Sequence, residues 1–356
     1  MKKLLCALLI LSILLLALAG CNNKSPNQPS DTTGEAQVPE NPLKIGVLSG
    51  TTGMGIAKLA SDLKASDDTS SSDIRQYYDD IVIYTEPSTL LSDMIAKKVD
   101  VAALPTNAAA TLFNKSNGDV KALAINTLGV LYILDNTNEI KSLSDLEGKT
   151  VYVATPGQTP EYILRSIIEK NNVENVTFAY DYTDLDTLTG EVAKGEKVKI
   201  ALLPEPKVTI AMTKAASMNN ANLAVAIDLT EEWNKVQGTT LTQGCIVARK
   251  DVIENQAIEL KQFLKDYKVS IEFVTNPENV DSASEMIAAT GILPNAAVAK
   301  KALPKCNIAY LDGQELKDAL SGFLKVLFDM DAKAVGGTLP NDDFYLSDED
   351  AEYFYK

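Results

Sequence analysis

The feature that most constrains this chain is the regular alternation of short apolar runs with helical patterns. Strands are predicted at residues 44–48, 81–85 and 99–104, and each is followed by a turn and a helical stretch. Ser88 is the expected N-cap of the helix after the second strand. This βαβα order predicts a mostly parallel sheet with helices on both faces, and therefore an α/β protein.

The same order restarts in the second part of the chain. A strand at residues 150–154 leads into a helix for which Thr159 is the expected N-cap and Pro160 the first helical residue. Further strands are predicted at residues 178–182, 200–204, 223–229 and 244–249, with a largely helical region at residues 255–328.

Two α/β blocks that are linked by two passes of the chain predict two lobes, one inserted in the other. Residues 43–356 also exceed the ~250–300 residues at which a single core usually stops growing. We expect lobe 1 to comprise residues 43–131 and 246–356, and lobe 2 to comprise residues 132–245. Strand ends and helix N-termini of both lobes would meet in a cleft, which is where open α/β sheets bind ligands.

The N-terminus carries the pattern of an export signal. Two lysines precede an apolar stretch that is too short to span a membrane. The segment Leu18-Ala19-Gly20-Cys21 resembles a lipobox, the sequence at which a signal peptide is cut and the new terminal cysteine is acylated. We expect a signal peptide at residues 1–20 and a lipid anchor on Cys21. In the alternative, an ordinary secretory signal is removed and Cys21 is incidental.

The segment after the signal has the composition of a tether. Residues 21–42 are rich in Asn, Ser, Thr, Pro and acids and hold almost no large apolar side chains. Such a segment buries too little apolar surface to compensate for the entropy of ordering. We therefore expect a lipid-anchored protein on the outer face of the cell membrane.

The complete absence of histidine excludes several classes of activity. It removes Ser-His-Asp and Cys-His catalysis, imidazole metal sites and the commonest general base at neutral pH. The chain also contains no phosphate-binding loop, dinucleotide fingerprint or cysteine cluster. We expect a protein that is not an enzyme and that needs no cofactor and no metal.

The net charge and the cysteines restrict the possible binding partners and metal sites further. The formal net charge of −15 does not suit binding to nucleic acid or to an anionic membrane face. Cys245 and Cys306 are too far apart in sequence for a metal motif. Outside the cytoplasm they could form a disulfide, or both could remain free thiols.

Three segments resemble a known family. These are residues 145–157 with the turn Leu146-Glu147-Gly148-Lys149, the strand end Pro204-Glu205-Pro206, and residues 245–253. They look like the substrate-binding proteins of nitrate, sulfonate, taurine and thiamin-precursor importers. The resemblance implies a type II periplasmic-binding-protein fold, in which two Rossmann-like lobes close on a ligand in the cleft between them. It also implies that a monomer delivers its solute to an ABC permease with a cytoplasmic ATPase.

One branch of the resembling family consists of enzymes. These thiamin-pyrimidine synthases consume a histidine of their own and bind iron beside a cysteine-rich motif. This chain has neither feature, which argues against the enzymatic branch.

Two loops are the main candidates for ligand contact. Residues 51–55 and 155–159 offer hydroxyls and backbone N–H groups at helix N-termini, where anions or polar ligand edges bind. In the alternative, the glycines serve only tight turns, and Thr159 serves only as a helix cap. The candidates in these loops are Thr51, Thr52, Gly53, Met54, Thr155, Gly157, Gln158 and Thr159.

The remaining candidates lie at strand ends and at the second crossover between the lobes. Glu86 and Glu205 would favour a cationic ligand if both face the cleft. Trp233 could stack on a flat ligand as a lid or could pack in the core. The other candidates are Thr106, Asn107 and Gln243.

The sequence leaves the ligand open. A nitrogen-containing organic molecule such as a thiamin-type pyrimidine is the preferred hypothesis, and an alkanesulfonate or taurine is the alternative. A surface hydrolase that uses Glu86 and Glu205 and a ligand-sensing lipoprotein are the competing classes.

Overall fold

The computed structural model describes residue 39, residues 41–66 and residues 74–356. The predicted signal peptide, the lipobox with Cys21 and nearly all of the predicted tether lie outside the described residues. None of the helices in this described part combines the length and the apolarity that a membrane crossing requires.

The first sheet has six strands in the order β11-β4-β10-β3-β1-β2. The central strand β1 pairs parallel with β2 and β3, whereas β10 runs antiparallel to both β3 and β4. The strands are β1 (Leu43–Leu48), β2 (Tyr78–Tyr84), β3 (Val101–Pro105), β4 (Val120–Leu128), β10 (Thr242–Arg249) and β11 (Ile308–Leu311).

The second sheet has five strands in the order β7-β6-β8-β5-β9. Strand β6 pairs parallel with β7 and β8, and β5 lies antiparallel between β8 and β9. The strands are β5 (Leu131–Asp135), β6 (Thr150–Val153), β7 (Thr177–Ala179), β8 (Ile200–Pro204) and β9 (Ala224–Asp228).

Both sheets are therefore mixed, and the prediction of a mostly parallel sheet is wrong. Strands β5 and β10 run antiparallel to both of their neighbours, and each is the first strand that the chain forms after it passes to the other sheet. The edge strand β11 is also antiparallel, to β4. The α/β class itself is confirmed. Strands β4, β5 and β11 were not predicted as strands, and β11 lies inside the region expected to be helical.

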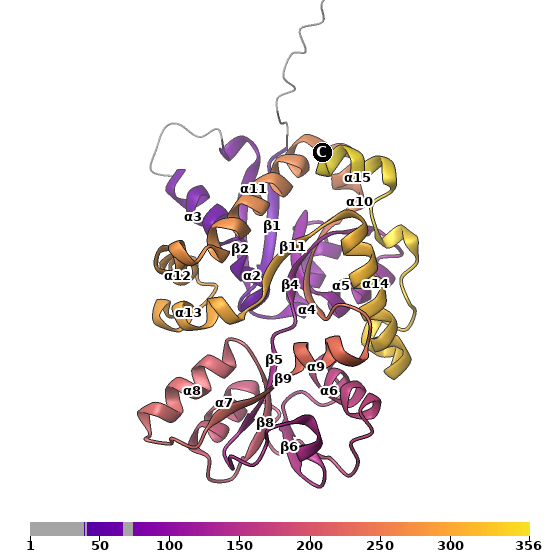
Figure 1. The fold of residues 1–356 in the computed structure, drawn as a ribbon. Helices are drawn as coiled ribbons and strands as arrows, with labels where there is room; N and C mark the ends of the chain where they lie inside the picture. Colours follow the sequence, from indigo (N-terminus) through magenta and orange to yellow (C-terminus); the bar gives the residue numbers. More distant parts are fainter. Residues whose placement is uncertain (1–38, 40, 67–73) are drawn as a thin grey trace, which may run out of the picture. The chain divides into compact units, whose positions relative to one another are not determined.

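Helices cover the two faces of the first sheet (Figure 1). One buried cluster joins this sheet to α3, α11, α12 and α13, and another joins its opposite face to α4, α5 and α14. These helices are α3 (Ala57–Ala65), α4 (Pro87–Ile95), α5 (Thr106–Lys115), α11 (Ala257–Thr275), α12 (Val280–Ala289), α13 (Ala296–Ala302) and α14 (Gly313–Met330).

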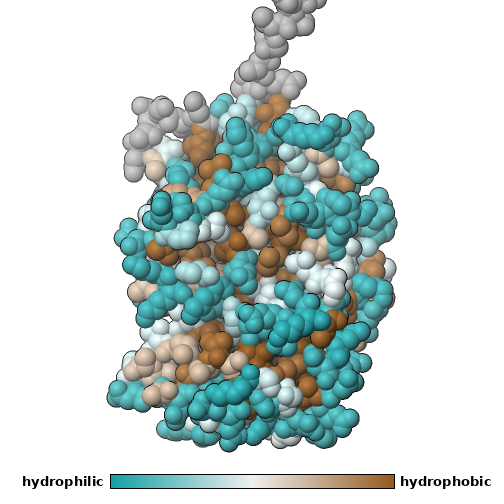
Figure 2. All heavy atoms as spheres, viewed as in Figure 1, coloured by the Kyte–Doolittle hydropathy of each residue, from teal (hydrophilic) through white to brown (hydrophobic). Residues whose placement is uncertain are grey.

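The core that contains α14 continues into the second sheet and reaches α6 and α9. The face of the molecule in Figure 2 is largely hydrophilic, with apolar side chains in smaller patches. The other helices are α2 (Thr51–Met54), α6 (Thr159–Lys170), α7 (Leu185–Lys194), α8 (Lys207–Ser217), α9 (Leu229–Val236), α10 (Lys250–Asn255) and α15 (Asp348–Tyr355). Short 3-10 turns are η2 (Ile74–Gln76), η3 (Leu143–Leu146), η4 (Pro277–Asn279), η5 (Leu303–Lys305), η6 (Ala332–Val335) and η7 (Asp342–Phe344).

Two helix starts differ from their predictions by one or two residues. The N-cap of α4 is Glu86 rather than Ser88, because Pro87 has no N–H to satisfy and begins the helix. Helix α6 begins at Thr159 with Gln158 as N-cap, so Thr159 is a helical residue and not the cap.

Candidate functional site

The chain passes from the first sheet to the second through Leu128–Leu131, which we call the crossover segment. Leu128 N donates to Asn307 O at 2.9 Å, and Glu205 N donates to Val130 O at 2.9 Å. A Cβ atom at Gly129 would lie 2.3 Å from Thr230 Oγ1, so the hydroxyl of α9 lies directly against this backbone. Segments far apart in the sequence therefore meet at the crossover segment.

A polar cluster lies beside it at the end of the first sheet. Asn126 Nδ2 donates to Thr52 O at 2.8 Å and to Tyr267 Oη at 2.9 Å. A Cβ atom at Gly244 would lie 2.4 Å from Asn126 Oδ1, so glycine is required there for close approach of β10 to β4. Thr106 Oγ1 donates to Thr242 O at 3.2 Å. The structure thus brings the predicted residues Thr52 and Thr106 to the same end of the first sheet as Gln243.

Sequence reasoning missed Asn126 and Thr242 in this cluster. Strand β4 was not predicted, so nothing indicated that Asn126 faces the loop after β1. The polar pair Asn126-Thr127 inside an otherwise apolar run was the available signal, since buried polar side chains require specific partners.

Several buried polar atoms at this edge have no hydrogen-bond partner among the described residues. They include Thr230 Oγ1, Thr242 Oγ1 and Gln243 Nε2, and Thr242 is fully buried. A buried polar group without a partner costs about 1–3 kcal/mol. These atoms therefore favour a polar ligand or a water molecule that bonds them.

The first candidate loop is held tightly by its own backbone. Gly53 N donates to Gly50 O at 3.1 Å, and a Cβ atom at Gly53 would lie 2.2 Å from Leu48 O. Gly53 therefore lies in a tight turn where no side chain fits. Met54 is fully buried in the core with α11. Thr51 is half-buried and stays a candidate.

In the second candidate loop, a carboxylate already occupies the N-terminus of α6. Gly157 N donates to Glu161 Oε2 at 2.8 Å, and Glu161 is 6% exposed. Glu161 Oε1 also accepts hydrogen bonds from Arg165 Nε at 2.6 Å and Tyr180 Oη at 2.7 Å. The N–H group that was expected to face a ligand is therefore used inside the protein.

The other predicted residues of this loop differ in exposure. Thr155 and Gln158 are exposed, and Thr155 adopts a left-handed conformation with φ of 53°. Thr159 Oγ1 is buried and has no hydrogen-bond partner in the described part of the chain. These side chains stay candidates for ligand contact.

The two predicted carboxylates lie in opposite environments. Glu86 is exposed at the start of α4, as a surface acid would be. Glu205 is only 2% exposed, and its carboxylate accepts hydrogen bonds from Thr209 N at 3.1 Å and Thr209 Oγ1 at 3.0 Å. Burial raises the pKa of Glu205, and the Thr209 hydrogen bonds and the charge of Lys305 only partly offset this. Glu86 thus has the surroundings of a solvated surface acid, whereas Glu205 does not.

The neighbourhood of Glu205 joins the second sheet to the first. Tyr132 Oη of β5 donates to Lys305 O at 3.3 Å, next to η5 and β11. Burial and the nearby negative charges of Asp228 and Glu205 raise the pKa of Tyr132. Glu205 and Tyr132 therefore lie close to η5, which precedes β11 of the first sheet.

Trp233 is a core residue, which corrects its assignment as a lid. It is fully buried, its Nε1 donates to Thr239 O at 2.7 Å, and its ring centroid lies 5.6 Å from that of Phe323. The indole packs α9 against α14. Asn107, in the first turn of α5, is half-buried and stays a candidate.

Cys245 and Cys306 are buried free thiols, so the free-thiol alternative is confirmed for this pair. Cys306 Sγ donates to Ala302 O at 3.1 Å, and burial raises the pKa of Cys245 to about 12. No cluster of three or more Cys, Asp or Glu side chains suited to a metal ion occurs within residues 41–66 and 74–356.

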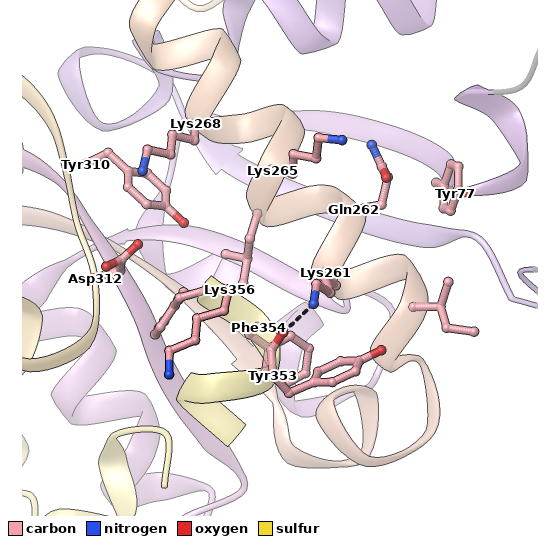
Figure 3. Close-up of a pocket in the computed structure, with 13 residues that line it drawn as sticks. Tyr77, Lys261, Gln262, Lys265, Lys268, Tyr310, Asp312, Tyr353, Phe354 and Lys356 are labelled. Atoms are coloured by element: carbon pink, nitrogen blue, oxygen red, sulfur yellow. Dashed lines mark hydrogen bonds between the residues drawn. The ribbon is translucent and has the colours of Figure 1, made fainter. Parts of the chain in front are cut away.

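The residues of the polar cluster line none of the cavities described in the structure. The one in Figure 3, about 380 Å³, lies along α11, β11 and α15 and is lined by Lys261, Lys265, Lys268 and several aromatic rings. Lys261 Nζ donates to Tyr353 O at 2.6 Å and stands 4.6 Å above the Tyr353 ring, so this lysine is already engaged. A second cavity of about 320 Å³ includes Asn307 and so reaches the crossover segment.

Two mixed β-sheets, joined by two passes of the chain and flanked by helices, define the periplasmic-binding-protein fold. Solved structures confirm this class. An ABC transporter protein from Parabacteroides distasonis has a TM-score of 0.70 at 24% identity and covers 87% of this chain and 100% of its own. The aliphatic sulphonate binding protein SsuA from Escherichia coli has a TM-score of 0.63 at 14% identity, over 86% of this chain and 91% of its own. SsuA from Xanthomonas axonopodis pv. citri, bound to MOPS, has a TM-score of 0.57 at 13% identity, over 86% and 96%.

The predicted resemblance to sulfonate-type binding proteins is therefore confirmed as a shared fold. Within this class, the chain belongs to the family described as menaquinone biosynthesis, whose model matches residues 78–301. A comparison with curated protein sequences finds no match.

Proposed function

We propose that this protein is an extracytoplasmic solute-binding protein that captures a small organic solute between two lobes and delivers it to an ABC importer. The fold shared with binding proteins of such importers supports this proposal. The observation that carries it is the group of buried, unpaired polar atoms at Thr230, Thr242 and Gln243, beside the crossover segment. A solute that bonds these atoms would remove their energetic cost on binding.

The lobes of the proposed protein divide where the chain passes between the sheets. Leu131 already belongs to β5, and β10 begins at Thr242. We therefore place the boundaries at the crossover segment and between α9 and β10, a few residues from the boundaries predicted from the sequence. Closure of one lobe on the other would bury the solute beside Glu205, Gln243 and the loop at Thr51.

The anchor and the cargo complete the proposal. Acylation of Cys21 would hold the protein on the outer face of the membrane, near its permease and ATPase. The solute is a nitrogen-containing organic molecule such as a thiamin-type pyrimidine, with alkanesulfonates as the alternative. The protein acts without catalysis, cofactor or metal, as a monomer.

A thermal-shift screen tests binding directly. The chain from Pro39 onward is suitable because its residues form one compact unit. Vitamins and their precursors, amines, amino acids, sulfonates and inorganic anions would each be added in excess. A ligand at a hundred times its dissociation constant adds about 2.7 kcal/mol to the free energy of unfolding. A saturable shift with one chemical class supports the proposal, and no shift with any class contradicts it.

The family description favours one second candidate, an enzyme that converts a small molecule in the same site. Glu205 could act as its acid or base, because a carboxyl group with a raised pKa suits that role. The two functions differ in turnover. Incubation of the protein with the compound that shifts its melting temperature, followed by mass spectrometry, would reveal a product only for an enzyme.

A further inference from the structure

The cavity along α11, β11 and α15 carries positive charge on an otherwise acidic protein (Figure 3). Four lysine side chains line this cavity, which we call the lysine pocket, and Asp312 supplies the one carboxylate side chain among the lining residues. The whole chain has a net charge of −15, but charges further apart than about 8 Å are largely screened at physiological ionic strength. A partner that touches the pocket therefore meets mainly positive charge. The four residues are Lys261, Lys265, Lys268 and Lys356.

The three lysines of α11 are not neutralised by the protein. Lys261, Lys265 and Lys268 recur with the spacing that places side chains on one face of a helix. Lys261 Nζ donates to the carbonyl of Tyr353, and Lys268 Nζ stands 5.4 Å from the centroid of the Tyr310 ring. In the part of the chain that the structure describes, none of the three forms an ion pair. Because an ammonium group has three donors, these side chains keep N–H groups for an anion.

The fourth lysine and the aromatic rings complete the pocket. Lys356 Nζ lies 2.9 Å from Glu352 Oε1, but these side chains are 73% and 71% exposed, and such a surface pair is weak. Tyr353 is 45% exposed beside the lysines. Tyrosine rings favour the level of lipid headgroups, because one end of the side chain is apolar and the other is polar. Lysines interleaved with tyrosines thus suit contact with an anionic membrane surface.

The N-terminal end of the described fold lies beside the same pocket. Asn41 N donates to Glu259 Oε1 of α11 at 3.2 Å, and Leu43 N donates to Tyr77 O at 2.7 Å. Tyr77 itself lines the lysine pocket. The chain that leads back to the predicted anchor at Cys21 therefore joins the fold next to the lysines.

Resting on the proposed anchoring at the outer face of the membrane, we infer that the lysine pocket binds the phosphate headgroups of anionic phospholipids in that membrane. A weak site is sufficient, because a tethered module meets its partner at an effective concentration of about millimolar. The lining residues belong to α11, β11, α15 and the segments next to them, which all pack on the first sheet. Contact with the membrane through this pocket leaves lobe 2 free to close on a solute.

The test is sedimentation of the chain from Pro39 onward, which has no lipid anchor, with phospholipid vesicles. One set contains phosphatidylcholine and phosphatidylglycerol in a three-to-one ratio, and the other contains phosphatidylcholine alone. The pocket variant combines Lys265→Gln, Lys268→Gln and Lys356→Gln. The control variant removes the same charge from exposed lysines of the second lobe that line none of the described cavities, and combines Lys170→Gln, Lys197→Gln and Lys214→Gln. All six side chains are exposed, so both variants should keep the fold, which far-UV circular dichroism checks.

We expect the parent to sediment with the anionic vesicles and not with phosphatidylcholine alone. Each lysine near an anionic surface contributes about fivefold to binding, so the pocket variant should bind at least about tenfold more weakly and the control variant within about threefold of the parent. Equal losses in the two variants overturn the inference, because net charge alone would then explain the binding. No sedimentation of the parent with the anionic vesicles also overturns it.

Two soluble probes, titrated by calorimetry, identify the other sources of negative charge. If glycerol 3-phosphate binds the parent and the vesicles do not, the pocket takes a free phosphate ester and the inference is wrong. If hexaglutamate binds and the vesicles do not, the pocket fits an acidic protein segment and the inference is equally wrong. Solute binding is not affected by any of these results, and the thermal-shift screen decides it separately.

Discussion

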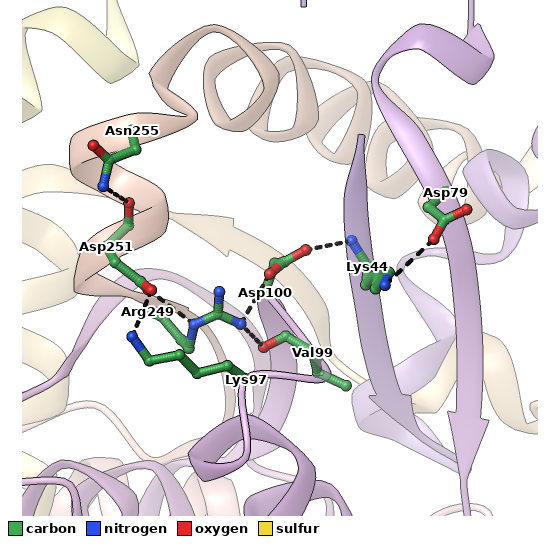
Figure 4. A network of polar contacts seen from close by, with 8 residues as sticks. All are labelled: Lys44, Asp79, Lys97, Val99, Asp100, Arg249, Asp251 and Asn255. Atoms are coloured by element: carbon green, nitrogen blue, oxygen red, sulfur yellow. Dashed lines mark hydrogen bonds and ion pairs between the residues drawn. The ribbon is translucent and has the colours of Figure 1, made fainter. Parts of the chain in front are cut away.

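The buried ion pair between Arg249 and Asp100 gives the most quantitative prediction for this fold. Arg249 Nη1 lies 2.8 Å from Asp100 Oδ1, and the two side chains are 9% and 10% exposed (Figure 4). Arg249 also donates to Val99 O and, at 2.9 Å, to Asp251 Oδ1. Asp100 in turn accepts from Lys44 N at 2.8 Å. The pair thus ties β10 to the ends of β3 and β1.

Replacement of Arg249 by Met keeps the apolar stem and removes the guanidinium. Asp100 would be left as a buried charge whose carboxylate keeps the hydrogen bond from Lys44 N but has lost its cation. Removal of one member of a buried ion pair typically costs about 3–5 kcal/mol. We expect the free energy of unfolding to fall by this amount in urea denaturation followed by far-UV circular dichroism.

Two further variants separate the buried pair from general effects of lost charge. Lys97→Met removes an ion pair to Asp251 whose side chains are 56% and 34% exposed, and such pairs contribute only about 0–1 kcal/mol. The double change Arg249→Met with Asp100→Leu should recover much of the loss, because neither partner then remains charged and buried. A loss below about 1 kcal/mol for Arg249→Met would refute the reasoning.

Three other predictions follow from the site and the N-terminus. Trp233→Ala should lower the free energy of unfolding by about 3–5 kcal/mol without a direct ligand contact, which denaturation and calorimetric titration of a binding probe would check together. Burial raises the pKa of Glu205 above its unfolded value, so the parent should lose stability as pH rises from about 4.3 through the folded pKa. Glu205→Gln should lack this loss and be the more stable protein at pH 8 but not at pH 4, as measured by denaturation at each pH. Cys21→Ser should move the full chain expressed in a bacterium from the detergent phase to the aqueous phase in a Triton X-114 partition, whereas an unchanged distribution would contradict a lipid anchor.

The local sequence patterns predicted the α/β class because each strand, turn and helix has its own pattern of residues. Strands β1, β3 and β8 occur where apolar runs were bounded by glycine or proline. Strands β4 and β5 were missed because residues 120–135 form one long and mostly apolar stretch, which only Lys121, the pair Asn126-Thr127 and Gly129 interrupt before Asp135. Periodicity cannot divide such a run, and the division depends on pairing with β10 and β8, which lie far away in sequence.

Site residues were predictable where loop chemistry is local and not where it depends on distant partners. The glycine at position 53 and the proline after Glu86 indicated a turn and a helix start that the structure contains. The burial of Trp233 depends on α14, about ninety residues later, and the burial of Glu205 depends on the crossover segment and η5. No spacing rule within one segment could have distinguished the exposed Glu86 from the buried Glu205.

The burial of Glu205 links the stability of this protein to its proposed function. A carboxylate that only caps a helix could remain at the surface, where its ionised form costs nothing. Glu205 caps α8 from a buried position, so its charge opposes folding at neutral pH. A buried charge that lowers the stability of the unliganded protein would be stabilised by a bound cation. If Glu205→Gln proves more stable but binds the compound found in the thermal-shift screen as tightly as the parent, the buried charge has no role in recognition.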